Sequence, residues 1–121
     1  MKKLSYATLK EQGYDGYLLE SAPERVLQFG EGNFLRAFVD YFIDELNEKA
    51  GFNSKVVLCQ PIAPGLADMI NEQEGLYTLF LRGFQDGQKV NKKRVISCVS
   101  RCLNPYQDFE AVLACADNPD L

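Results

Sequence analysis

The chain has 121 residues, 46% of them hydrophobic, and its 13 basic and 17 acidic residues give a net charge of −4. This length can bury one hydrophobic core, so at most one domain is expected. The negative charge argues against nucleic acid or an anionic membrane as an obligate partner, because both require a basic face. The sequence offers no apolar run for a signal peptide or a membrane span, and we expect a cytoplasmic location.

Residues 1–23 are polar and contain turn signals at Gly13, Gly16 and Ser21-Ala-Pro23. They predict an N-terminal arm or short helix that leads to the first strand. Several apolar side chains of this arm could dock on the body, namely Tyr6, Leu9, Tyr14, Tyr17 and Leu18. No function is inferred for the arm.

A short buried strand is predicted to end at Phe29, followed by a turn at Gly30 and Gly32 and then a helix. In doubly wound domains this junction holds a phosphate, because glycine lets the backbone approach closely and unpaired N–H groups of the first helical turn face the anion. The third glycine of the dinucleotide fingerprint is missing, since Leu35 stands in its place. An ordinary strand-to-helix connection is therefore the alternative.

The residues around the glycines resemble a known signature. The segment Gly30-Glu-Gly-Asn-Phe-Leu-Arg36 is similar to the signature near the N-terminus of the mannitol dehydrogenase family of long-chain polyol and sugar-acid dehydrogenases. Many mannitol dehydrogenases carry histidine where this chain has Phe38, whereas residues 29–40 resemble the tagaturonate reductase branch of the family. Gln73-Glu-Gly-Leu-Tyr-Thr78 and Leu81-Arg-Gly83 resemble the same branch. The resemblance covers residues 24–121, which correspond to only the first part of a normal family member.

Residues 33–49 predict a helix whose apolar arc spans about 200° at 100° per residue. The arc contains Phe34, Leu35, Phe38, Val39, Tyr41, Phe42, Ile43 and Leu46. The polar residues confined to the remaining arc are Arg36, Asp40, Asp44, Asn47 and Glu48. Such an arc is wider than one sheet face needs, so we expect the helix to contact a second surface as well as its own sheet. A thickly buried core helix is the alternative.

A second buried strand is predicted from Lys55 to Gln60, which implies a right-handed parallel β-α-β unit. At the end of this strand NAD enzymes normally place a carboxylate on the adenosine ribose, but this chain has Gln60, Pro61 and Ile62. Glutamine can hydrogen-bond to a ribose hydroxyl, yet it lacks the charge that repels a 2′-phosphate. The residues thus leave NAD or NADP open, and the family resemblance implies NAD.

The remaining predicted elements are a helix from Pro64 to Gly75, a strand from Leu76 to Gly83, a hairpin turn at Asp86-Gly87, a strand from Val95 to Leu103, and a helix capped by Asn104-Pro105. The buried stripe expected for the last helix consists of Phe109, Val112, Leu113 and Ala116. The basic stretch from Lys89 to Arg94 favours a solvated hairpin edge over a phosphate site.

The four cysteines, at positions 59, 98, 102 and 115, lie in apolar segments and indicate reduced core thiols. The chain contains no histidine and no C-x-x-C spacing, so a zinc site is not expected.

These elements predict an α/β, Rossmann-like fold, part of a doubly wound and mostly parallel sheet with flanking helices. After the arm, residues 24–121 are expected to be the N-terminal part of a dinucleotide-binding domain, truncated before its remaining strands and the substrate domain. The expected cofactor-binding residues are Phe29, Gly30, Glu31, Gly32, Asn33, Phe34, Leu35, Arg36, Gln60, Pro61 and Ile62.

The resemblance implies the NAD-binding part of an oxidoreductase that interconverts D-altronate and D-tagaturonate by hydride transfer in hexuronate catabolism. A small sugar acid would be the substrate of the full-length protein. Fructuronate reductase or mannitol dehydrogenase is the neighbouring alternative, and an S-adenosylmethionine-binding or regulatory nucleotide-binding module is the alternative of another class. No catalytic residue or metal ligand is expected in these residues, so the chain alone is expected to be inactive. Its cut sheet edge is expected to promote self-association.

Overall fold

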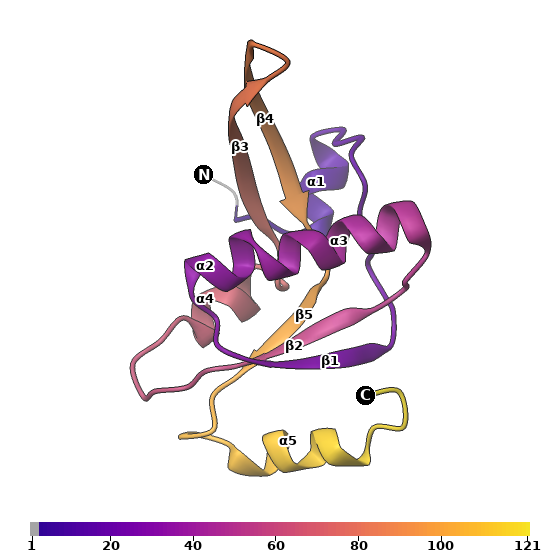
Figure 1. Cartoon of the computed structure of the whole chain (residues 1–121). Coiled ribbons are helices and arrows are strands. Elements are labelled where there is room, and N and C mark those ends of the chain that lie inside the picture. The colour runs from indigo at the N-terminus through magenta and orange to yellow at the C-terminus, as the bar shows by residue number, and fades with distance from the viewer. Residues whose placement is uncertain (1–2) are drawn as a thin grey trace.

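The computed structural model describes residues 3–121 as an α/β fold (Figure 1). Three parallel strands form the sheet in the order β1-β2-β5: β1 (Glu24–Phe29), β2 (Lys55–Cys59) and β5 (Val99–Leu103). A separate antiparallel hairpin consists of β3 (Tyr77–Gln85) and β4 (Gln88–Ile96). The predicted α/β class with a parallel sheet is confirmed, whereas the third predicted strand belongs to the hairpin and not to the sheet.

The helices flank the sheet on both faces. They are α1 (Tyr6–Glu11), α2 (Asn33–Ala37), α3 (Val39–Ala50), α4 (Ala67–Glu72), α5 (Phe109–Ala114) and the 3₁₀ turn η1 (Cys115–Asp117). Figure 1 shows α2 and α3 on one face of the sheet and α5 on the other. No helix among residues 3–121 is long and apolar enough to cross a bilayer.

Strand β2 is the centre of the sheet, and all five of its residues are buried, as predicted. Val56 and Leu58 join the core cluster that also includes residues of α4 and β5, while Val57 packs against Cys115 below the opposite face. Strand β1 is paired on one side by β2, and the structure describes no strand on its other side. The prediction of a buried first strand is therefore wrong at its end, where Phe29 is 67% exposed.

The hairpin turn is confirmed at Asp86-Gly87, whose φ values of 54° and 78° suit the two-residue turns that join twisted strands. The predicted strand from Val95 to Leu103 is instead two strands, because Ser97 and Cys98 interrupt it between β4 and β5. The basic stretch from Lys89 to Arg94 lies within β4, where its lysines are exposed. This placement agrees with the solvated hairpin edge.

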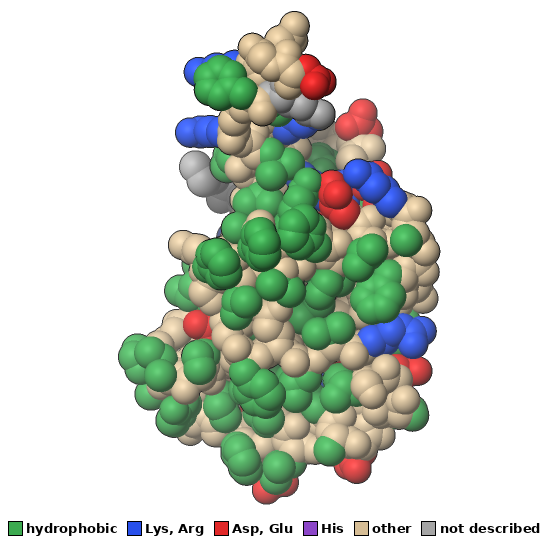
Figure 2. Space-filling model, viewed as in Figure 1, with side chains coloured by type: hydrophobic (Ala, Val, Ile, Leu, Met, Phe, Trp, Pro, Cys, Tyr) green, Lys and Arg blue, Asp and Glu red, His purple; other side chains and the backbone are tan. Residues whose placement is uncertain are grey.

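The helix predicted over residues 33–49 is divided at Phe38, whose backbone (φ −114°, ψ −70°) separates α2 from α3. Its orientation also differs from the expectation, because the polar arc and not the phenylalanine row faces the sheet. Three polar side chains of α3 are buried: Asp40, Asp44 and Asn47. Four apolar side chains are 47–74% exposed: Phe34, Phe38, Phe42 and Leu46. Hydrophobic side chains accordingly gather on the outer side of α2 and α3 in Figure 2.

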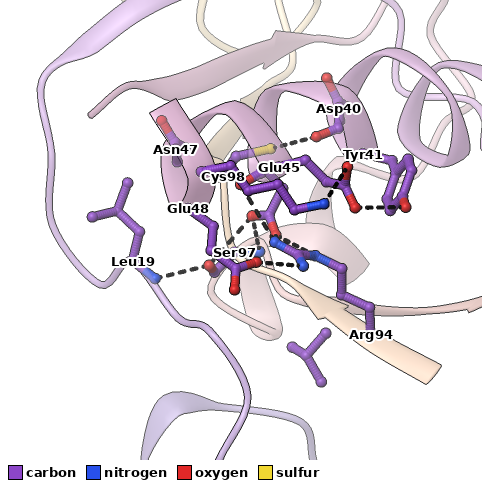
Figure 3. A network of polar contacts seen from close by, with 12 residues as sticks. Leu19, Asp40, Tyr41, Glu45, Asn47, Glu48, Arg94, Ser97 and Cys98 are labelled. Atoms are coloured by element: carbon purple, nitrogen blue, oxygen red, sulfur yellow. Dashed lines mark hydrogen bonds and ion pairs between the residues drawn. The ribbon is translucent and has the colours of Figure 1, made fainter. Parts of the chain in front are cut away.

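Buried polar side chains remain stable only when they are hydrogen-bonded, and α3 satisfies two of them fully. The Asp44 carboxylate accepts from the Ser97 N–H at 2.9 Å and forms an ion pair with Arg94 at 2.8 Å (Figure 3). Asn47 exchanges two hydrogen bonds of 2.9 Å with the backbone of Ser54. These contacts join α3 to the β4–β5 junction and to the segment before β2.

The N-terminal arm docks on the hairpin side of the molecule, as the sequence indicated. Tyr6 and Leu9 of α1 are buried in a small cluster with Leu76 and Val95. Lys55 donates from Nζ to the Tyr6 hydroxyl at 3.0 Å, so the arm is also linked to the beginning of β2.

The last helix begins later than predicted. A turn follows Asn104, and Asp108 caps α5 by accepting from the Ala111 N–H at 3.1 Å. Of the predicted stripe only Val112 packs inward, and Ala111 and Cys115 are its actual neighbours. Phe109, Leu113 and Ala116 are exposed because the helix is rotated relative to that stripe.

All four cysteines are free and buried, which confirms the prediction of core thiols. Burial raises the pKa of Cys102 to about 12 and also raises the pKa of Cys98, so both thiols stay protonated at neutral pH.

The Asp44–Arg94 contact predicts a difference between two neighbouring carboxylates. Asp44→Asn should lower the free energy of unfolding by about 3 kcal/mol or more, because it leaves the largely buried Arg94 guanidinium with only one of its two carboxylate partners. Glu48 binds the same arginine at 2.7 Å, but its side chain is 39% exposed. Glu48→Gln should therefore cost less than about 1 kcal/mol. Urea unfolding of both variants at pH 7 tests this, and equal losses would contradict it.

Candidate functional site

The glycine turn connects β1 to α2 at the carboxyl end of the sheet. Its first residue, Gly30, donates from its N–H to the Cys59 carbonyl at 2.9 Å, which holds the turn beside the end of β2. Gly30 has φ +131°, and a Cβ added there would lie 2.6 Å from Leu35 Cδ1. The backbone conformation therefore favours glycine at this position, while the Leu35 side chain could shift to admit a Cβ.

Gly32 is glycine for a different reason. It is the N-cap of α2 with φ −67°, a value that any residue adopts, and a Cβ added there would meet nothing within 4 Å. The fold itself thus places no demand on this position. The space in front of Gly32 is open, and the first N–H groups of a helix have no acceptor within that helix. The turn can accept an anionic group at its backbone.

Arg36 supplies positive charge on one side of the turn. Its Nη2 donates to Asn33 Oδ1 at 2.8 Å, and its guanidinium lies 5.0 Å from the centre of the Tyr77 ring on β3. A cleft of about 380 Å³ separates α2 from β3, lined by Asn33, Arg36, Ala37, Tyr77, Thr78, Leu79 and Phe80. The sequence analysis found Asn33 and Arg36 but missed the contribution of β3, because Tyr77 lies 41 residues further along the chain.

The loop after β2 lies at the same end of the sheet. Gln60 is only 2% exposed, and its side chain is fully used within this loop. Its Nε2 donates to the carbonyls of Ile62 and Ala63 at 2.9 and 2.7 Å, and its Oε1 accepts from the Ala67 N–H at 3.1 Å. This geometry does not offer the Gln60 amide to a ribose, whereas Pro61 and Ile62 are among the exposed residues of the loop.

Buried polar atoms without partners concentrate at the turn. Within residues 3–121, the buried side-chain nitrogen and oxygen atoms that lack a hydrogen bond are Gln28 Oε1, Glu31 Oε2, Arg36 Nε and Asp40 Oδ1. Leaving such an atom without a hydrogen bond costs about 1–3 kcal/mol. Buried polar atoms without partners therefore need an explanation, such as a role in binding. Sequence analysis named Glu31 and Arg36 but missed Gln28 and Asp40. The spacing of polar residues at positions 40, 44 and 47 indicates a polar face of α3, but the stronger pattern of the phenylalanine row obscured it.

A second hollow, of about 470 Å³, lies near the amino ends of the strands, with Glu20, Glu24, Lys55 and Glu74 in its wall. Its Lys55 ammonium already donates to the Tyr6 hydroxyl and to the Ser97 carbonyl. The excess of carboxylates disfavours an anionic cofactor there. Among the residues the structure describes, no group of three or more Cys, Asp or Glu is arranged to hold a metal ion.

A known protein family matches most of the chain. The family model described as the mannitol dehydrogenase Rossmann domain matches residues 24–121. The chain belongs to the mannitol dehydrogenase family. The match begins at the first residue of β1 and includes every strand of the sheet and the hairpin.

Curated relatives within this family are altronate oxidoreductases. The protein of Halalkalibacterium halodurans is 44% identical over all of this chain and 24% of its own length. Those of Phocaeicola vulgatus and Bacillus subtilis are 50% and 47% identical over 82% and 85% of this chain, and over 21% of their own lengths. The chain therefore spans about a quarter of the length of these relatives.

Solved structures show the same fold. Pseudomonas fluorescens mannitol 2-dehydrogenase, in a ternary complex with NAD and D-mannitol, superposes with a TM-score of 0.79 at 23% identity over 99% of this chain and 25% of its own. A substrate-free D-sorbitol dehydrogenase superposes with a TM-score of 0.78 at 22% identity over 98% of this chain and 25% of its own. The Rossmann fold of this mannitol dehydrogenase family chain is thus confirmed.

The two glycines of the turn predict opposite tolerance to a methyl group. Gly30→Ala should lower the free energy of unfolding by about 1–3 kcal/mol, because its φ is unfavourable for alanine. Gly32→Ala should change it by less than about 0.5 kcal/mol. Thermal unfolding of both variants measures the difference, and similar losses would show that the turn conformation is assigned incorrectly.

Proposed function

We propose that this chain forms part of the NAD-binding domain of an enzyme that interconverts D-altronate and D-tagaturonate by hydride transfer. The sugar acid is proposed as the substrate of the whole protein, and the 121-residue chain alone is proposed to be inactive. It contains no histidine. NAD, when bound, supplies the hydride acceptor for the oxidation of altronate.

The observation that carries the proposal is the open position at Gly32. The fold does not require glycine there, yet the turn lies at the carboxyl end of a parallel sheet, where doubly wound domains bind nucleotides. A glycine that the backbone does not need indicates that the space in front of it has a use. The pyrophosphate of a dinucleotide fits this space, because it is anionic and pairs with backbone N–H groups.

The other predicted residues take different parts in this proposal. The Arg36 guanidinium attracts the phosphates from the side of β3, and Asn33 holds that guanidinium in place. Gln60 shapes the loop after β2 from within, so the exposed Pro61 and Ile62 would flank the adenosine. The turn is flanked by Phe29 and Phe34, and it includes the Glu31 backbone. No side chain of this set identifies NAD over NADP, and the choice of NAD rests on the family.

Among the enzyme alternatives, the curated relatives support altronate oxidation over fructuronate reduction or mannitol oxidation. Family membership also disfavours the S-adenosylmethionine-binding or regulatory module, since the family is one of dehydrogenases. We propose that residues 1–23 form an arm outside the cofactor domain. We also propose a cytoplasmic location for the protein, which is consistent with its four free thiols.

Replacing Gly32 with valine tests the proposed pyrophosphate site. Gly32→Val should weaken NADH binding at least tenfold, which is about 1.4 kcal/mol, because the side chain enters the space assigned to the phosphates. Gly83 is a matched control, since it is also open and lies on β3 away from the turn. Calorimetric titration and a melting curve on the same samples separate binding from stability. Unchanged affinity in folded Gly32→Val protein would remove the site.

We also propose that the chain self-associates through the free edge of β1 and the adjoining face of α2 and α3. The edge presents unpaired backbone groups, and the phenylalanine row beside it is exposed. Light scattering over a concentration series should detect a dimer or larger species that Phe42→Lys weakens. Phe84→Lys, on the hairpin tip and 82% exposed before substitution, should leave it intact. A strict monomer at high concentration would rule the association out.

A further inference from the structure

Two of the unpartnered atoms beneath the glycine turn belong to one contact. The Gln28 side chain donates from Nε2 to Asp40 Oδ2 at 3.3 Å and to the Gly30 carbonyl at 3.1 Å. The atoms left without partners are the other oxygen of the Gln28 amide and the other oxygen of the Asp40 carboxyl. If Asp40 is ionised, both are acceptors and neither can satisfy the other.

One proton resolves both deficits. A hydrogen on Asp40 Oδ1 would convert that atom into a donor, and Gln28 Oε1, the unpartnered oxygen of the side chain already bonded to Asp40, is an available acceptor. The amide and the acid then form a pair with two hydrogen bonds, one in each direction. The second Nε2 hydrogen of Gln28 remains bonded to the Gly30 carbonyl, so the pair is connected directly to the turn.

The surroundings of Asp40 favour its neutral form. Asp40 is completely buried, and its neighbour Asp44 has an arginine partner that Asp40 lacks. The charged and titratable groups around Asp40 are Arg36 on α2, Asp44 on α3, Tyr77 on β3 and Cys98 before β5, whose Sγ donates to the Asp40 carbonyl (Figure 3). Burial raises the pKa of Asp40 to about 6, against the opposing effects of the Gln28 hydrogen bond and the Arg36 charge.

We propose that the protonated form of Asp40 makes an acid–amide pair with Gln28 that positions the glycine turn in the folded chain. The inference rests on the proposed function only where it concerns cofactor affinity. Ionisation of Asp40 removes the donor to Gln28 and leaves a negative charge beneath a turn that would receive pyrophosphate. Asp40 and Gln28 are positioning residues, because neither is assigned a contact with the cofactor.

The direction of the pH effect follows from the raised pKa. The folded chain holds the Asp40 proton more tightly than the unfolded chain does, whose value is near 3.8. The stabilisation is complete below that value and is lost as the pH rises through about 6. Anion binding at the turn should weaken over the same range.

The protonation state can be measured without any ligand. In chain labelled with ¹³C at the aspartate carboxyls, the resonance that disappears in Asp40→Asn should titrate with a midpoint above pH 5. Asp68→Asn, which alters an exposed carboxylate on α4, should leave that resonance in place. A midpoint below pH 4 for the resonance lost in Asp40→Asn would overturn the proposal.

Asparagine at position 40 imitates the neutral acid, because its amide donates and accepts in the same places. Asp40→Asn should fold, and its melting temperature should rise relative to that of the native chain as the pH increases from 4 to 7, because the variant has no proton to lose at this position. Gln28→Leu removes the donor to Gly30 and should lower the melting temperature at every pH. A lower melting temperature of Asp40→Asn at pH 5 would show that the carboxylate is what the fold needs, and would overturn the pair.

Cofactor binding gives the last measurement. The NAD⁺ dissociation constant of the native chain should rise at least about threefold from pH 5.5 to 7.5, whereas that of Asp40→Asn should stay within about twofold. An equal rise in both proteins would overturn the positioning role. Absence of NAD⁺ binding at every pH would contradict the proposed function alone, since the carboxyl titration and melting curves decide the acid–amide pair independently.

Discussion

The inward-facing polar row of α3 is the constraint on which the arrangement of this domain depends. Asp44 binds the Ser97 N–H and Arg94, Asn47 binds the Ser54 backbone, and Asp40 binds Gln28. These contacts reach the β4–β5 junction, the segment before β2, and β1, so one helix fixes the relative positions of all three strands. Because such groups are stable in the interior only with partners, α3 has one allowed rotation. The phenylalanine row is exposed as a consequence.

That rotation also determines the geometry of the turn. The chain leaves β1 through Gly30, which is tied to the end of β2, and enters α2 at Gly32 with α3 already fixed below. The turn is thus held from two sides, while the backbone around Gly32 stays open. A rigid support under an accessible backbone is what close binding of a phosphate requires. Two of the polar atoms without partners, Gln28 Oε1 and Asp40 Oδ1, belong to this support.

Local sequence signals predicted the parts of the fold that local chemistry controls. The apolar run of β2, the Asp86-Gly87 turn and the glycine junction were each recognisable, because burial on both faces, positive φ and close backbone approach demand particular residues. The family resemblance at residues 30–36 identified the cofactor domain, which the family model supports over residues 24–121. The eleven expected cofactor residues all lie at the turn or in the loop after β2, although Gln60 is directed into its own loop.

The remaining features depend on contacts distant in sequence. Helical periodicity showed two faces on residues 33–49, but contacts outside the helix determine which face is buried, among them those with Ser97 and Arg94 about 50 positions later. The break at Ser97-Cys98 depends on the same contact, because the Ser97 N–H bonds to Asp44 instead of continuing a ladder. The shift of the helix cap from Asn104 to Asp108 follows from the turn at Asn104, which the Asn-Pro pattern alone does not distinguish from a cap.

The central claim is that the backbone around Gly32 receives the pyrophosphate of a dinucleotide. A ¹H–¹⁵N correlation experiment on the 121-residue chain, titrated with NADH, tests it most directly because it reports each amide separately. The account predicts that the largest shifts fall on residues 30–34 and that smaller ones fall on the loop at residues 61–63. Shifts confined to the hollow around Lys55, or no shifts at saturating NADH, would contradict it.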